Sequence, residues 1–344
     1  MSWLEDEIDE QPAALARLIE RQLPAARRVA ALLARGDVQY VLIASRGSSS
    51  NAARYAQYLL GRAHRVPVMF ATPSLYTIYE QPPRLDGAAV IGISQSGASP
   101  DVTSVLVEAR RQGRPTIALT NNLESPLARA ADEVLSLEAG DEKAVAATKT
   151  YMNSIGAIAL LFAAADGATA EAELAAMPAA LERQIALSRE AAPSIDEYRD
   201  AIGATVVGRG VNYGTAFEIA LKIRELSGLV VEAYSPADLM HGPIAAIRPD
   251  WPVVLVAPTG PARPSVEDVV VPLVERGARL LAISDVAAVL RRAQTKLPLV
   301  PRVPEWLSPL TAVIPGQLTA LRLAQLRGLD IDKPIGLQKV TLTR

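Results

Sequence analysis

Short apolar runs alternate with longer stretches of helical period along the first 140 residues of the chain. The apolar runs predict strands over residues 39–45, 88–93, 115–119 and 133–137. The intervals predict helices around residues 50–62, 100–112 and 124–131. Strands that alternate with helices in this way indicate a parallel sheet that is covered by helices on both faces.

The same rhythm restarts in the second half of the chain, and three glycine-containing turns recur at nearly constant spacing. Gly47 is matched by Gly210 and Gly97 by Gly260, both 163 residues further on, and Gly113 is matched by Gly277 after 164 residues. A constant offset of this kind is typical of internal duplication. The sequence therefore predicts two tandem, doubly wound, flavodoxin-like α/β domains with parallel sheets.

The expected boundaries follow from this repeat. We expect a helical lead-in over residues 1–35, a first domain over 36–190, a second over 196–330 and a C-terminal tail over 331–344. A stretch rich in Ala, Leu and Glu from about residue 148 to 196 is expected to connect the domains through helices.

Composition excludes several kinds of chemistry. The 344 residues include no cysteine and two histidines, which excludes disulfides, cysteine-ligated zinc, iron–sulfur clusters, thiol nucleophiles and multi-histidine metal sites. A magnesium site made of carboxylates alone stays open on these grounds. Lys and Arg number 35 against 37 Asp and Glu, and aromatic residues make up 4%, so neither charge nor stacking surface favours a nucleic-acid partner.

The chain carries no sign of export or membrane insertion. Its acidic start lacks the basic patch and apolar stretch of a secretory signal. The longest apolar run, residues 155–165, is too short to cross a bilayer and predicts a buried helix. A cytoplasmic location is therefore expected.

Two serine-rich turns follow predicted strands in the first domain, over residues 46–50 and 94–101. In a doubly wound sheet such turns lie at the carboxyl ends of strands, where ligands bind. Serine hydroxyls, backbone N–H groups and helix N-termini together suit a phosphate group. The alternative is that these serines are ordinary helix caps. The matching turn of the second domain, residues 257–261, lacks the serines, so the sheet itself does not require them.

A third turn of the first domain, residues 140–149, carries paired charges and leads into a helix. By itself this pattern is unspecific, and it is typical of a solvated surface loop.

The predicted helix over residues 213–225 places Glu218, Lys222 and Glu225 on one face. Thr215 and Glu218 fit a capping box, and Glu218 with Lys222 fits an exposed ion pair. Neither explanation applies to Glu225, which lies near the helix end, where the helix dipole disfavours a negative charge. It is therefore a candidate for proton transfer.

The two histidines differ in their settings. A lone histidine is more often structural, but His241 lies in a turn held by Gly242 and Pro243, which strengthens the case for a functional role. His64 is expected to lie at a solvated helix end.

Several motifs occur in the order found in one known family: EIDEQP from Glu7, ISQSGASPD, ALKIRELSGLVVEAY, DLMHGP and the terminal GLDIDKPIGLQKVTLT. In these motifs the chain resembles the tandem sugar isomerase (SIS) domains. Such domains form the isomerase half of glutamine–fructose-6-phosphate aminotransferase and the stand-alone alternative type of glucosamine-6-phosphate deaminase. The resemblance covers nearly the whole chain.

The resemblance implies a role for each matching residue. The phosphate-binding positions it implies are Ser48, Ser49, Ser94, Gln95, Ser96 and Ser99. The sugar-binding positions it implies are Val145, through its backbone, and Gln338. The catalytic positions it implies are Glu225, Lys222, His241 and Lys339.

Among the catalytic positions, the resemblance makes Glu225 the base that moves a proton between C1 and C2 of an open-chain sugar. It assigns ring opening to His241, which reaches the neighbouring subunit's site and so implies a homodimer. Lys222 lies near the sugar hydroxyls, and Lys339 matches a lysine that can form a Schiff base with the ketose in the synthase. The tail closes the active site, and no cofactor or metal is implied.

The leading interpretation is conversion of glucosamine 6-phosphate and water to fructose 6-phosphate and ammonia. The chain lacks both the length and the cysteine of the synthase's glutaminase domain, which favours release of ammonia over its incorporation. Ile335 and Gly336 follow Pro334 where the family often has a polar residue, which leaves the sugar open. The alternatives are a deglycase or deaminase acting on fructosamine or galactosamine 6-phosphate, and a non-catalytic phosphosugar sensor.

Overall fold

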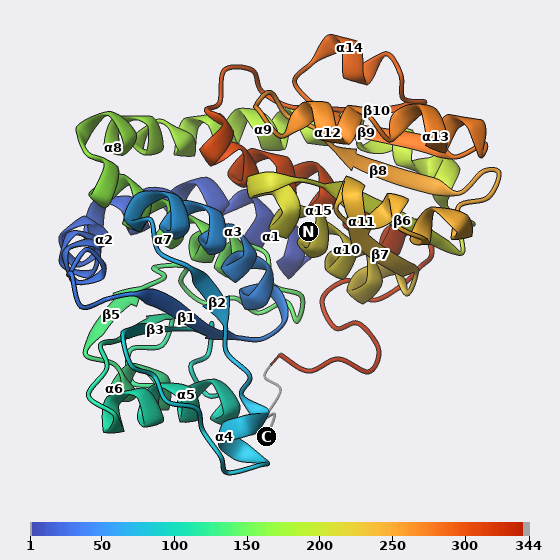
Figure 1. Cartoon of the computed structure of the whole chain (residues 1–344). Coiled ribbons are helices and arrows are strands. Elements are labelled where there is room, and N and C mark those ends of the chain that lie inside the picture. The colour runs from blue at the N-terminus through green and yellow to red at the C-terminus, as the bar shows by residue number, and fades with distance from the viewer. Residues whose placement is uncertain (1, 340–344) are drawn as a thin grey trace. The chain divides into compact units, whose positions relative to one another are not determined.

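A computed structural model describes residues 2–339 of the chain. The chain forms two compact units, each built on one sheet (Figure 1). The sheet-A unit comprises Glu10–Glu142, Ala147–Pro178 and the chain from Gln338. The sheet-B unit comprises the start of the chain through Asp9, the short segment Lys143–Ala146, and Ala179–Leu337.

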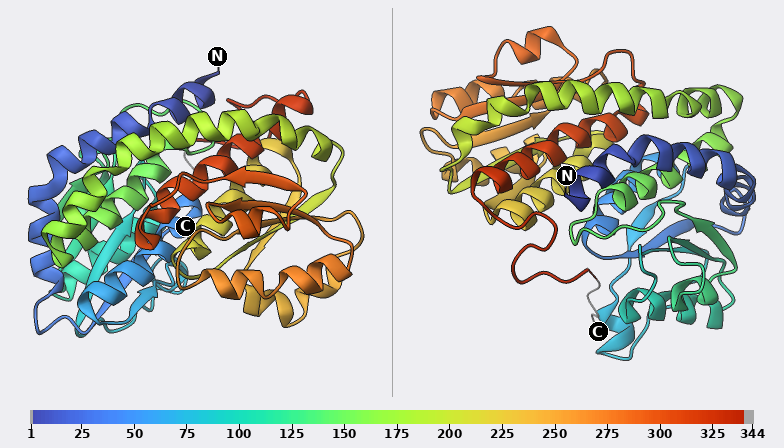
Figure 2. Two further views of the ribbon diagram at one scale, coloured as in Figure 1. Left: turned by 90° about the horizontal axis from the view of Figure 1, so that it is seen from above. Right: turned by 180° about the vertical axis from the view of Figure 1, so that it is seen from behind.

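The sheet-A unit contains five parallel strands in the order β2-β1-β3-β4-β5. Helices α3 and α7 lie on one face of the sheet, and α5 and α6 lie on the other (Figures 1 and 2). Its elements are α2 (Gln11–Leu33), β1 (Tyr40–Ser45), α3 (Gly47–His64), β2 (Val68–Phe70), α4 (Ser74–Thr77), β3 (Ala88–Ile93), α5 (Pro100–Arg111), β4 (Thr116–Thr120), α6 (Pro126–Ala130), β5 (Glu133–Ser136), α7 (Lys149–Asp166) and α8 (Ala168–Ala175).

The sheet-B unit repeats the arrangement, with five parallel strands in the order β7-β6-β8-β9-β10. Its elements are α1 (Trp3–Asp9), nearly all of α9 (Met177–Ala191), η1 (Ala192–Tyr198), β6 (Gly203–Gly208), η2 (Gly210–Asn212), α10 (Tyr213–Ser227), β7 (Val230–Tyr234), α11 (Pro236–Met240), η3 (Pro243–Ala246), β8 (Pro252–Val256), α12 (Arg263–Glu267), α13 (Val270–Glu275), β9 (Arg279–Ser284), α14 (Ala287–Leu290), β10 (Thr295–Pro298), η4 (Glu305–Leu307) and α15 (Ser308–Leu326).

The fold prediction of two parallel α/β domains related by duplication is confirmed, since strand order is the same in both units. The six glycines that define the repeat all have positive φ, from +52° at Gly47 to +156° at Gly260. Each therefore occupies a turn conformation that residues with a side chain rarely adopt. This explains why these glycines recur in both halves.

The central strands are buried because each is covered on both faces. β1, β3 and β4 are almost wholly buried runs of Val, Ile, Leu and Ala, which matches the predicted strands. The predicted helix over residues 155–165 forms part of α7 and is buried through Ala163. β2 was not predicted, because it has only three residues and two of them, Met69 and Phe70, are largely exposed.

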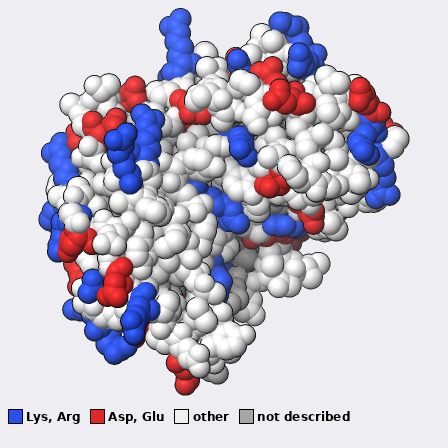
Figure 3. All heavy atoms as spheres, viewed as in Figure 1, with Lys and Arg blue, Asp and Glu red and all other residues white. Residues whose placement is uncertain are grey.

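The surface view in Figure 3 shows basic and acidic side chains interspersed on the visible face, consistent with the near-balance of charge. Within residues 2–339, no helix combines the length and apolar character that crossing a bilayer requires.

Candidate active site

The two serine-rich turns lie at the carboxyl ends of neighbouring strands in sheet A. They follow β1 and β3, which are neighbouring strands that pair in register up to Ser45 opposite Ile93. From β1 the chain crosses to β2 on one side, and from β3 it crosses to β4 on the other. This is the reversal point where doubly wound sheets form a crevice at the carboxyl ends of their strands. The two turns therefore lie next to each other at this end of the sheet.

Two serines of the second turn shape its backbone. The hydroxyl of the buried Ser94 accepts a hydrogen bond from the Gly97 N–H at 3.2 Å, and the Ser96 hydroxyl accepts one from the Ala98 N–H at 3.3 Å. Because each hydroxyl acts there as an acceptor, its own proton stays available for an anion.

Other groups in the two turns are left for a ligand. Arg46 and Ser99 occupy the N-cap positions of α3 and α5, and neither makes a side-chain capping bond. The part-buried side chains of Ser49, Gln95 and Ser99 form no hydrogen bond with the part of the chain that the structure describes. The alternative that the turn serines are ordinary side-chain caps therefore does not hold for Ser99. Ser48, in the first turn of α3, is part-buried too, but it is engaged in a contact within the chain.

An ion pair joins the two turns. Arg46 Nε donates to Asp101 Oδ2 at 2.6 Å, and Asp101 Oδ1 accepts the Val102 N–H at 2.9 Å. The Asp101 side chain is fully buried, whereas the Arg46 side chain is half exposed. This bridge fixes the start of α3 against the start of α5. The sequence analysis did not identify it, although an arginine after one strand and an aspartate in the first turn of the next helix were visible there.

In the sheet-B unit, α10 carries a chain of three charges. Lys222 is fully buried between Glu218 and Glu225, with Nζ 3.6 Å from Glu218 Oε1 and in direct hydrogen-bond contact with Glu225 Oε2. Glu218 is also fully buried, but the Glu225 side chain is 22% exposed. Glu225 is thus the member of the group that a ligand can reach.

Two predictions for α10 were wrong. Glu218 and Lys222 form a buried pair rather than an exposed one, because their face of α10 packs inside the unit against α15. Thr215 does not cap the helix, because α10 begins at Tyr213 with Asn212 in the N-cap position. The spacing of an amphipathic helix is the same whether the charged face is buried or exposed.

The two histidines also differ in the structure. His241 is exposed at the end of α11, and its Nδ1 lies 2.7 Å from the Ala237 carbonyl oxygen. A carbonyl can only accept, so Nδ1 carries a proton and Nε2 is the nitrogen that can exchange one. His64 ends α3 as predicted, but it is half-buried rather than solvated, and burial lowers its pKa.

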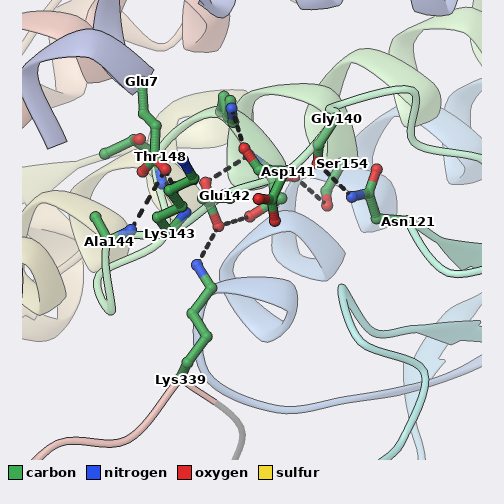
Figure 4. Close-up of polar contacts among 12 residues, drawn as sticks. Glu7, Asn121, Gly140, Asp141, Glu142, Lys143, Ala144, Thr148, Ser154 and Lys339 are labelled. Carbon is green, nitrogen blue, oxygen red and sulfur yellow. Dashed lines mark hydrogen bonds and ion pairs between the residues drawn. The ribbon is translucent and has the colours of Figure 1, made fainter. Parts of the chain in front are cut away.

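The charged turn before α7 is not a solvated loop throughout, which corrects the expectation. Glu142 and Lys149 are buried, and the Lys339 Nζ donates to Glu142 Oε2 at 2.6 Å (Figure 4). Glu142 is thus a residue that sequence reasoning missed. Its cationic partner lies 197 residues away in the sequence, so no local pattern could have paired them.

The remaining predicted sugar contacts lie on exposed or part-buried chain. The Val145 N–H donates to the Asp332 carbonyl at 3.0 Å, and within residues 2–339 the Val145 carbonyl accepts no backbone hydrogen bond. Asp332 also accepts the N–H groups of Trp3 and Leu4 and so anchors the tail to α1. Gln338 is exposed.

The predicted residues therefore form two sets. The sheet-A unit holds both serine turns, Gln338 and Lys339, and the sheet-B unit holds Lys222, Glu225, His241 and Val145. The available serine side chains and the lysine belong to one unit, and a reachable carboxylate and an exposed imidazole belong to the other. Two units with parallel sheets of the same strand order define a duplicated α/β protein.

Comparisons with known proteins place this architecture. The SIS domain family model matches twice, at residues 32–164 and 197–327. The chain belongs to the SIS domain family, with two SIS domains in tandem.

Some relatives match this chain over their whole length, and others over only part of it. The glutamine–fructose-6-phosphate aminotransferase of Pyrococcus horikoshii is 34% identical over 343 residues, which is 97% of this chain and 56% of that protein. The chain thus spans little more than half the length of this curated relative. The C-terminal domain of the corresponding Francisella tularensis enzyme has a TM-score of 0.85 at 25% identity, covering 97% of this chain and 98% of that chain. The glucosamine-6-phosphate deaminase of Thermotoga maritima shares the fold, with a TM-score of 0.79 at 22% identity over 99% of this chain and 100% of that chain.

Proposed function

We propose that the protein is an isomerising deaminase of a phosphorylated amino sugar, converting glucosamine 6-phosphate and water to fructose 6-phosphate and ammonia. The observation that carries the proposal is the state of Glu225, a reachable carboxylate in direct contact with a buried lysine. The serine turns, with side chains available for an anion at a sheet switch point, support a phosphate anchor for the same substrate.

The proposed reaction has three stages. His241 opens the sugar ring by exchanging a proton through Nε2 with the ring and anomeric oxygens. Glu225 then takes the proton from C2 and returns it to C1, while the amine nitrogen gives up a proton and O1 gains one, which turns the aldose amine into a ketose imine. Water adds to the imine carbon, the C–N bond breaks, and ammonia leaves with the proton balance restored by solvent. The phosphate anchor holds C1 and C2 in place for the transfer.

Three further assignments belong to this proposal. Lys339 supplies a cation, or a Schiff-base amine, at the reacting carbons, and Lys222 fixes the orientation of Glu225. Val145 and Gln338 contact the sugar. His241 serves the site of the neighbouring subunit, so the working form is a homodimer.

A product assay tests the proposal. Purified protein is incubated with glucosamine 6-phosphate, and the ammonia and fructose 6-phosphate that form are measured. Parallel incubations use fructosamine 6-phosphate or galactosamine 6-phosphate as the substrate. Equal amounts of both products from glucosamine 6-phosphate are expected. If only one of the other two sugar phosphates is turned over, that compound is the substrate and glucosamine 6-phosphate is not. Tight binding without turnover of any of the three would contradict an enzymatic role and indicate a sensor.

Two variants, Glu225→Gln and the control Glu275→Gln, test whether the activity belongs to this site. Glu275→Gln in α13 removes an exposed carboxylate of the same unit and should leave product formation unchanged. Glu225→Gln, in contrast, should remove nearly all product formation.

A further inference from the structure

The turn between β5 and α7 contains a carboxylate that is out of contact with solvent. The Glu142 side chain is fully buried, although the residues on either side of it, Asp141 and Lys143, are exposed. A buried charge is costly unless it is paired and hydrogen-bonded, so its partners indicate what it is kept for.

Four donors reach the Glu142 carboxylate (Figure 4). Oε1 accepts the N–H groups of Thr148 and Thr150, both at 3.0 Å. Oε2 accepts the Thr150 hydroxyl at 2.7 Å and the Lys339 Nζ at 2.6 Å. All four are donors, so the carboxylate is bound as the anion.

These contacts have different purposes. The three contacts from Thr148 and Thr150 lie at the start of α7, where the helix dipole also favours a negative charge. They fix the position of Glu142 without any help from Lys339. The carboxylate is therefore a rigid acceptor to which the mobile, four-carbon side chain of Lys339 is attached.

We propose that Glu142 is a positioning residue for Lys339. It holds the ammonium group, and with it the chain at residues 338–339, against the sheet-A unit at a fixed point. Without it, the lysine side chain loses this rigid acceptor and is expected to sample more rotamers. The consequence for catalysis rests on the proposed function, in which Lys339 acts at the reacting carbons.

Glu142→Gln is the informative change, because glutamine keeps the shape and an amide oxygen for the two N–H groups of α7 but presents no charge to Lys339. Glu10→Gln is the matched control. It breaks the neighbouring contact of the buried Lys149 with Glu10, in the same unit and beside the same turn, and leaves Lys339 untouched. General weakening of the turn would appear in both variants.

The first measurement does not depend on activity. Lysine side chains are acylated with a limiting amount of an amine-reactive reagent, and the rate of acylation at Lys339 is measured by peptide mass spectrometry. Glu142→Gln should raise the rate at Lys339 several-fold over wild type and over Glu10→Gln. Equal rates in all three proteins would overturn the proposal.

The second measurement is kinetic. Glu142→Gln should lower kcat by about 10- to 100-fold with little change in KM, since misplacing a catalytic group by about 1 Å has effects of this size. Glu142→Gln added to Lys339→Met should lower kcat no further than Lys339→Met alone, because Glu142 acts through Lys339. A fully additive double variant would show that Glu142 acts only on the fold, and would overturn the proposal.

Two outcomes keep this inference separate from the proposed function. If wild type turns over no amino-sugar phosphate, the proposed function fails while the labelling result at Lys339 still decides the role of Glu142. If Glu142→Gln does not fold, Thr150→Val removes one hydroxyl that orients Oε2 and keeps the charge. It should raise labelling at Lys339 about two-fold, and an unchanged rate would contradict the proposal.

Discussion

The two units share a strand order and a set of glycine turns, yet they differ where chemistry would occur. After β3 in the sheet-A unit, the turn carries serines with available side chains, and a helix begins at its end. After β8 in the sheet-B unit, the matching turn is tied to the turn after β9, since the Thr259 N–H donates to Asp285 Oδ1 at 2.7 Å. The doubly wound fold therefore offers the same position in both copies, and the side chains placed there differ.

At the first helix of each repeat, it is the sheet-B unit that carries the distinctive side chains. α10 of the sheet-B unit carries the Glu218, Lys222 and Glu225 cluster, whereas α3 of the sheet-A unit has no acidic residue. In the proposed mechanism, this divergence separates substrate anchoring from proton transfer. Each can then be changed without altering the other, and this expectation can be tested.

The largest effect is expected at the sheet-B unit. Glu225→Gln should reduce kcat by about 1,000-fold, because glutamine cannot carry the proton between C1 and C2. Binding of the sugar phosphate, measured by calorimetry, should change by less than about three-fold, because the anchor lies in the other unit. Full activity of Glu225→Gln would remove Glu225 from the mechanism.

The tight serine turn of the sheet-A unit is the next target. Gly97 has φ of +61°, and a Cβ there would lie 2.1 Å from the Ser125 hydroxyl oxygen. Gly97→Ala should therefore lower the free energy of unfolding by about 3 kcal/mol, measured by urea denaturation. Gly113→Ala has similar strain but open space around the new Cβ, so it should cost only about 1 kcal/mol. Equal losses would show that the turn is less tightly packed than its geometry indicates.

A smaller effect separates the anchors of the two units. Ser99→Ala and Ser49→Ala should each weaken sugar-phosphate binding by about 10-fold, the value of one hydrogen bond to a charged group, with kcat nearly unchanged. Thr259→Ala changes the corresponding turn of the sheet-B unit and should leave affinity unchanged. A loss of affinity in Thr259→Ala would contradict the division between the units.

The smallest effect concerns His64, in the sheet-A unit. Burial lowers its pKa, so the unfolded chain binds its proton more readily than the folded chain does. Stability from this residue is complete above the unfolded pKa of 6.5 and falls as the pH drops below it. His64→Gln should flatten the decline in melting temperature between about pH 7 and pH 5. An unchanged slope in His64→Gln would assign the decline to other groups.

The sequence allowed prediction of features that depend on local pattern. The strands β1, β3, β4 and β5 were visible as apolar runs, and the repeat glycines marked turns that require positive φ. The burial of Glu218 was not visible, because whether a helix face is covered depends on α15, nearly a hundred residues later. Glu142 was missed for the same reason, since its cation comes from the far end of the chain.

The pairing of Glu142 with Lys339 also bears on the order in which the protein is made. The strands of sheet A and the helix α7 have all been synthesised by the time the ribosome reaches Pro178. Since domains generally fold as they emerge, the buried carboxylate is formed early and stays without its cation until Lys339, 197 residues later, is added. A chain that stops before Lys339 would keep the scaffold of this unit but lack the cation, so under the proposed mechanism it is expected to bind a sugar phosphate without turning it over.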